Sequence, residues 1–106
     1  MVNNDSNTLS IIKQTASKII PGCKVLLFGS RARNDNDNES DYDFLVISDK
    51  TLDTQIKRSL KSILRKELAR YKIPADVFVF SQEEINNKKE ITGHIIKQIL
   101  IEGVAI

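Results

Sequence analysis

Three aspartates occupy positions from which their carboxylates could gather around a metal ion. Asp41 and Asp43 flank the start of an apolar run at i, i+2 spacing, so in extended backbone both side chains point to the same face. Asp76 opens a later apolar run. Clustered carboxylates raise one another's pKa unless a cation lies between them, and such oxygen-rich sites suit Mg²⁺ or Mn²⁺. The pattern predicts a site for two divalent ions, although an isolated Asp-x-Asp pair also occurs often by chance.

A glycine–serine turn precedes the aspartates and has the character of a phosphate-binding turn. Gly29 and Ser30 follow the apolar run VLLF, at the point where a short helix would begin. Glycine lets a phosphate approach the backbone closely, and the first N–H groups of a helix are free to bind it. Arg31 and Arg33 follow, and a guanidinium group suits phosphate oxygens. Either arginine could instead pair with an acid of the NDNDNES loop, so the sequence leaves open which of them contacts phosphate.

The combination of turn, spacing and aspartates resembles a known family. The segment LLFGSRARNDNDNESDYDFLV is similar to the minimal nucleotidyltransferase (MNT) branch of the DNA polymerase β-type nucleotidyltransferase superfamily, and the resemblance extends through ADVFVF. It implies that Gly29 and Ser30 contact a nucleoside triphosphate such as ATP. It also implies that Asp41 and Asp43 bind the metal that bridges the phosphates. Asp76 would then help to bind a second metal and activate an acceptor hydroxyl, as general base.

The same resemblance implies an activity and a partner. Relatives of this kind act with a small helical HEPN-domain protein in toxin–antitoxin pairs, where the MNT protein transfers AMP from ATP to a tyrosine of the toxin. Two other functions remain open: a non-catalytic module that neutralises a partner by docking, and a nucleotidyltransferase for a small molecule. The short chain argues against the latter, because it leaves no room for an acceptor-binding domain. One departure from the family is Asn34, where many relatives carry glycine, but asparagine tolerates left-handed backbone.

The elements that would position these residues follow from hydrophobic periodicity and from the Gly and Pro positions. We expect a single α/β (α+β) domain over residues 1–106, with residues 1–7 flexible and a small mixed sheet of three to four strands on which helices pack. The expected helices cover residues 8–20, 30–33 and 52–71 and two short segments after Ser81, the last over 91–102; the expected strands cover 24–28, 42–48 and 75–80. The second and third strands should be joined by a helical crossover.

Composition narrows the class of protein. Of the 106 residues, 41% are hydrophobic and 28% charged, and the formal net charge is +2, which argues against strong nucleic-acid binding. The single cysteine, the polar N-terminus and the lack of a membrane-length apolar run predict a cytoplasmic protein. The basic face of the long helix is expected to be solvated. The segment from Ile91 to Ile101 has more apolar side chains than one buried stripe of a helix can hold. Some of them should therefore be exposed, which predicts a partner protein or a homo-oligomer.

Overall fold

A computed structural model describes residues 6–37, 39–91 and 93–106 of the chain. The elements in chain order are α1 (Ser6–Ile19), β1 (Lys24–Phe28), α2 (Gly29–Arg33), β2 (Tyr42–Ser48), α3 (Thr54–Arg70), β3 (Ala75–Ser81), α4 (Gln82–Lys88), α5 (Ile95–Glu102) and β4 (Val104–Ala105). The first helix thus begins two residues earlier than predicted. Of the segment expected to be flexible, residues 1–5 lie outside the described residues.

The strands form one mixed sheet in the order β3-β2-β1-β4. The polar loop after α2 reverses the chain, so β1 and β2 pair antiparallel, with Phe28 opposite Asp43. The long helix α3 carries the chain over the sheet, so β2 and β3 pair parallel, as a crossover connection requires. The mixed α/β architecture and the helical crossover are therefore confirmed. The short strand β4, which pairs antiparallel with β1, was not assigned from the sequence.

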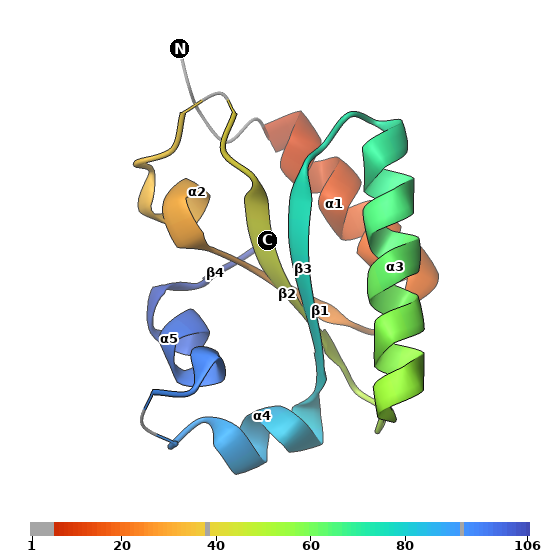
Figure 1. Cartoon of the computed structure of the whole chain (residues 1–106), viewed down its shortest axis with the longest axis vertical. Coiled ribbons are helices and arrows are strands. Elements are labelled where there is room, and N and C mark those ends of the chain that lie inside the picture. The colour runs from red at the N-terminus through yellow and green to blue at the C-terminus, as the bar shows by residue number, and fades with distance from the viewer. Residues whose placement is uncertain (1–5, 38, 92) are drawn as a thin grey trace.

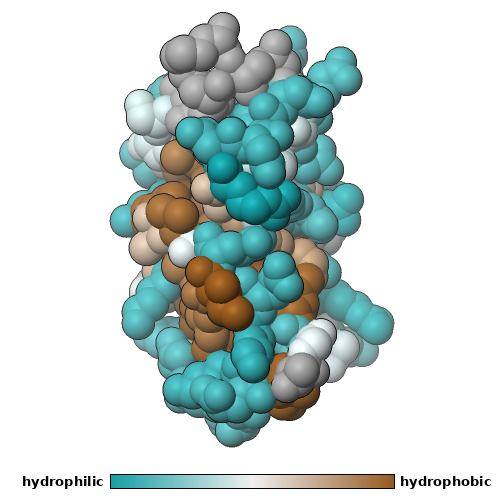
Figure 2. Space-filling view, turned by 90° about the vertical axis from the view of Figure 1, so that its left-hand side faces the viewer, coloured by the Kyte–Doolittle hydropathy of each residue, from teal (hydrophilic) through white to brown (hydrophobic). Residues whose placement is uncertain are grey.

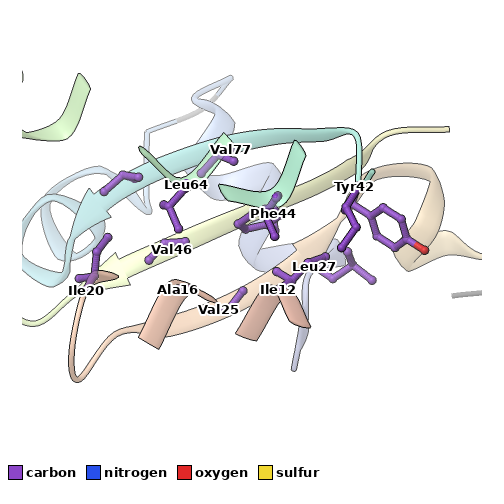
Figure 3. Packing of buried hydrophobic residues seen from close by; sticks show 13 residues of the cluster. Ile12, Ala16, Ile20, Val25, Leu27, Tyr42, Phe44, Val46, Leu64 and Val77 are labelled. Atoms are coloured by element: carbon purple, nitrogen blue, oxygen red, sulfur yellow. The ribbon is translucent and has the colours of Figure 1, made fainter. Parts of the chain in front are cut away.

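Helices cover both faces of the sheet (Figure 1). Helices α1 and α3 lie on one face, where Leu64 and Leu68 pack with Phe44 and Val77 in the larger cluster of buried side chains, part of which is shown in Figure 3. Helices α4 and α5 lie on the other face. Their buried residues, which are Ile85, Ile96 and Ile99, pack against Phe28, Leu45 and Ile47 of the central strands. Because both faces are covered, residues 25–28 of β1 and 44–47 of β2 are continuously apolar, as their sequences predict.

Three details differ from the expected elements. Helix α5 begins at Ile95 and not at Ile91, because the ring nitrogen Nδ1 of His94 accepts a hydrogen bond from the Ile96 N–H and caps the helix there. Of the apolar stripe predicted for α3, Ile56 and Ile63 are exposed, so the buried part of that stripe is narrower. The capping box predicted for Ser81 and Glu84 is present at the start of α4.

The expected exposure of the isoleucine-rich C-terminal segment is confirmed in part. Ile96 and Ile99 are buried, whereas Ile95, Leu100 and Ile101 remain exposed, Ile101 at 77% of its surface. Figure 2 shows apolar side chains gathered among polar ones on the face of the molecule that includes this segment.

Candidate active site

Two of the three predicted aspartates face each other across the parallel strand pair. Asp43 of β2 and Asp76 of β3 are partners in the register, and both lie near the start of their strands. Asp41 is exposed and comes just before β2, two residues from Asp43. The helical crossover is what brings Asp76 here, because a parallel pair places the starts of both strands at the same end of the sheet. The predicted convergence is therefore present for Asp43 and Asp76, whereas no group of three acids that could hold a metal ion is found within residues 6–37, 39–91 and 93–106.

The glycine–serine turn lies directly against Asp43. Gly29 follows β1 and has a φ of +74°, a left-handed conformation that favours glycine. A methyl group on its Cα would collide with the Asp43 carboxylate. Antiparallel pairing of β1 with β2 causes this approach, since Phe28 stands opposite Asp43 and Gly29 is the next residue. The turn at Gly29 and the Asp43 carboxylate are thus parts of one site.

The two arginines of the turn have different surroundings. The Arg31 side chain is buried, donates hydrogen bonds to the Ser40 carbonyl at 2.9 and 3.2 Å, and lies over the Tyr42 ring at 3.9 Å. Tyr42 itself points into the helix-covered core, away from the aspartates on either side of it, as predicted. Arg31 therefore braces the loop that leads into Asp41. Arg33 is exposed, and its side chain extends toward α5, where it contacts Glu102.

A residue that the sequence analysis did not single out completes the site from the C-terminal end of the chain. Glu102, the last residue of α5, accepts a hydrogen bond from the Gly29 N–H at 3.0 Å. The same carboxylate lies 3.4 Å from Nη1 of Arg33, which also pairs with Asp35 at 3.1 Å. Only folding shows this contact, because 73 residues separate Gly29 from Glu102 along the chain. The sequence offered no local pattern that would have linked them.

The charge balance of the site is unfavourable without a cation. Burial raises the pKa of Asp43, and the neighbouring carboxylates of Asp76 and Asp41 raise it further. Glu102 adds to this effect, and only Arg33 opposes it. The site therefore holds more negative charge than its own residues neutralise, which is the electrostatic condition under which a bound cation is stabilised.

The donor set fits a divalent ion that is shared with a substrate. All the candidate ligands are carboxylate oxygens, which suit Mg²⁺ or Mn²⁺. Among the described residues, however, no three acidic, histidine or cysteine side chains are close enough to form a metal cage of their own. That arrangement agrees with the way Mg²⁺ is commonly bound, through one or two carboxylates with substrate phosphates and water supplying the remaining ligands.

Comparison with known proteins identifies the family. Residues 9–106 match the family model described as a nucleotidyltransferase domain. A protein of Methanocaldococcus jannaschii named "Putative protein adenylyltransferase" is 35% identical over 80 residues, which covers 76% of this chain and 73% of that protein. The chain belongs to the nucleotidyltransferase domain family. As a member of this family the nucleotidyltransferase is an enzyme, which confirms that prediction.

Solved structures share the fold of the nucleotidyltransferase. A chain from a toxin–antitoxin crystal structure with AMP-PNP has a TM-score of 0.59 and 18% identity, and covers 96% of this chain and 72% of its own length. A chain from a complex of tri-AMPylated Shewanella oneidensis HEPN toxin with MNT antitoxin has a TM-score of 0.53 and 22% identity, with coverages of 93% and 67%. These similarities confirm the expected polymerase β-type core.

Two further sequence predictions can be compared with the structure of the nucleotidyltransferase. Asn34, which stands where many relatives have glycine, has a φ of 66° and so adopts the left-handed conformation expected of it. No helix within residues 6–37, 39–91 and 93–106 has the length and apolar character needed to cross a membrane.

Neutralising Asp43 should stabilise the metal-free protein. Because the folded-state pKa of Asp43 is raised, its contribution to stability is fully present below the unfolded-state value near 3.8 and is lost as the pH rises through the folded-state pKa. At neutral pH the Asp43 charge therefore opposes folding. We expect Asp43→Asn to raise the Tm measured in EDTA at pH 7. A Tm equal to or below that of the wild type would contradict the electrostatic account of the site.

Proposed function

We propose that this nucleotidyltransferase transfers AMP from ATP to a tyrosine hydroxyl of a small helical HEPN-domain partner, in a reaction that depends on divalent ions, Mg²⁺ above all. One observation carries the proposal. The turn at Gly29 and the carboxylates of Asp43 and Asp76 lie at one end of the sheet, which is the arrangement that an in-line displacement at a triphosphate needs.

The donor half of the reaction is assigned to the turn and the first two aspartates. The missing side chain of Gly29 lets the Asp43 carboxylate lie against the turn, and we assign to the Ser30 hydroxyl a hydrogen bond to a phosphate oxygen. Of the two arginines, we assign the phosphate contact to Arg33, since Arg31 is buried against Ser40 and Tyr42. Asp41 and Asp43 would hold the ion, which, when bound, neutralises the charge of the phosphates.

The acceptor half is assigned to Asp76. Its side chain is exposed and lies across the strand pair from Asp43, so it can accept the proton of an incoming hydroxyl at the same site. Nucleophilic attack of that hydroxyl oxygen on the α-phosphorus of ATP forms the new P–O bond, and pyrophosphate leaves with the electrons of the broken bond. A second ion shared by Asp43 and Asp76 would supply charge neutralisation there.

The names of the relatives favour a protein acceptor. The curated relative is named as a protein adenylyltransferase, and one structural neighbour comes from a complex with an AMPylated HEPN toxin. A small-molecule acceptor would need a binding pocket of its own at the aspartates. The hollows along α3, between α1 and α3, and at α5 are not lined by Asp41, Asp43 or Asp76. We therefore place the acceptor on a second protein.

The proposal is tested with ATP labelled at the α-phosphate, Mg²⁺ and a HEPN-domain protein from the same organism as the acceptor. We expect label on the HEPN protein, dependence on the divalent ion, and loss of labelling when the modified tyrosine is changed to phenylalanine. Label that appears only on a small molecule, or a HEPN protein that is neutralised without any label, would replace this function with one of the two alternatives.

Glu102 should position the phosphate turn. Its carboxylate holds the Gly29 N–H and Arg33 together, and a displacement of about 1 Å in a substrate-positioning group can cost up to 10²-fold. We expect Glu102→Ala to raise the KM for ATP about tenfold with a smaller loss in kcat, and Glu102→Gln, which keeps a hydrogen-bond acceptor, to be milder. Glu90→Ala, at an exposed acid two residues after α4, is the control. A lower KM in Glu102→Ala would show instead that this carboxylate competes with phosphate.

A further inference from the structure

A cavity lies along the basic face of α3, and its lining does not include Asp41, Asp43 or Asp76. It has a volume of about 560 Å³ and is lined by Arg58, Lys61, Arg65 and Lys66, together with Pro74 and Ala75 at the start of β3. A second hollow of about 200 Å³ shares Arg58 and Lys61 with it and continues along β3 to Phe80. The two together form a groove between α3 and the outer side of β3, which we call the α3–β3 groove.

The positive charge of the chain is concentrated on α3. The helix carries six basic residues and one acid, a formal charge of +5, in a chain whose total is +2. Like charges three or four residues apart on a helix are destabilising, and Arg58, Lys61 and Arg65 have this spacing. The four basic residues of the larger cavity form no ion pair with an acid among the described residues. The nearby pairs instead use Lys57 with Glu84 and Arg70 with Glu67.

The other wall of the groove is an open strand edge. Strand β3 is the last strand on its side of the sheet, and no described strand pairs with its outer side. Such an edge presents backbone N–H and C=O groups to which an extended peptide can add. Lys57 and Lys61 lie over the Phe80 and Phe78 rings at 5.4 and 5.7 Å, so positive charge also follows this edge. A basic wall beside an open strand edge fits an extended chain with acidic side chains.

The position of the groove connects it with the reaction. Its larger cavity reaches Ala75, the residue next to Asp76, to which the proposed function assigns the acceptor hydroxyl. We propose that the α3–β3 groove binds an acidic segment of the acceptor protein and thereby delivers the neighbouring hydroxyl to Asp76. This inference rests on the proposed function for the identity of the acceptor as a protein. The positive charge of the groove would also attract an acidic partner, which the negative charges of Asp41, Asp43 and Asp76 alone would repel.

The binding test uses a fluorescein-labelled oligoglutamate peptide that contains one tyrosine, and measures fluorescence anisotropy with the full chain. We expect binding that weakens steeply with added NaCl, since exposed charges are screened. Arg58→Ser with Arg65→Ser should weaken it roughly tenfold, as expected for the loss of two exposed ion pairs. The matched control is Lys13→Ser with Lys18→Ser, which removes the same charge from exposed positions on α1.

The outcomes separate this inference from the proposed function. If the peptide does not bind, or if both double variants weaken its binding equally, the groove is not its site. If a labelled single-stranded RNA of equal charge binds more tightly than the peptide and loses its binding in the Arg58/Arg65 variant, the groove is a nucleic-acid site and the inference is overturned. In transfer assays the Arg58/Arg65 variant should raise the KM for the acceptor protein about tenfold and leave the KM for ATP unchanged. Asp41→Asn with Asp43→Asn should abolish transfer and leave peptide binding intact.

Discussion

Changing Asp41 and Asp43 together to asparagine is expected to reduce nucleotidyl transfer by roughly two orders of magnitude or more, as for the loss of a group that stabilises transition-state charge. Asparagine has nearly the same shape, but it lacks the negative charge that would hold the divalent ion against the phosphates. The measurement is the initial rate of label transfer from α-labelled ATP to the HEPN partner at saturating Mg²⁺. Because Asp43 is destabilising in the metal-free state, the double variant should remain folded, and its Tm should show this.

The matched control for this pair is Asp49→Asn. Asp49 is exposed and directly follows the last residue of β2. It therefore lies at the opposite end of this strand from Asp41 and Asp43. We expect it to leave the transfer rate within about twofold of the wild type, as for a surface substitution that contacts no reacting group. If Asp41→Asn with Asp43→Asn keeps the full rate, these residues do not hold the ion, and the site must be sought elsewhere in the family's fold.

Gly29→Ala is expected to lower both stability and activity. The left-handed conformation at φ +74° costs a non-glycine residue about 1–2 kcal/mol, and the added methyl group must also displace the Asp43 carboxylate. For a domain of this size, each kcal/mol lowers the Tm by roughly 4–8 °C. The same displacement moves a proposed metal ligand, so transfer should fall roughly 100-fold at a temperature where the protein is still folded.

A second glycine separates the two causes of this effect. Gly93 has a φ of +82°, but a methyl group there would meet nothing within 4 Å. Gly93→Ala should therefore show the backbone cost alone, with a smaller fall in Tm and no loss of transfer beyond what the lower stability explains. Equal losses of transfer in the two variants would mean that the close approach of Gly29 to Asp43 has no part in the reaction.

The exposed isoleucine and leucine side chains of α5 are consistent with a protein partner, but they do not identify one. Their exposure arises because α5 packs against the sheet with one side only, where Ile96 and Ile99 contact the cluster that contains Phe28 and Leu45. The α3–β3 groove differs from this surface because its charge specifies the chemistry of what it can bind.

Much of the donor site could be predicted from the sequence because its parts are local or are connected by recognisable elements. The glycine before a helix, the Asp41–Asp43 spacing and the asparagine at position 34 are short-range patterns whose conformations follow from backbone sterics. The position of Asp76 could be predicted as well. A helix between two apolar runs indicates a parallel pair, and a parallel pair brings the starts of both strands to the same end of the sheet.

The tertiary structure decided which charges share the site, because those contacts join distant parts of the chain. Arg31 and Arg33 are equivalent in the sequence, and only packing buries the first against Tyr42 and leaves the second exposed. Glu102 reaches Gly29 because α5 packs on the sheet face beside β1. The sequence by itself determined the candidate metal ligands and the candidate phosphate-binding turn. The burial of individual side chains, the register of the strands and the α3–β3 groove depend on packing between distant parts of the chain. Hydrophobic periodicity along the sequence does not specify that packing.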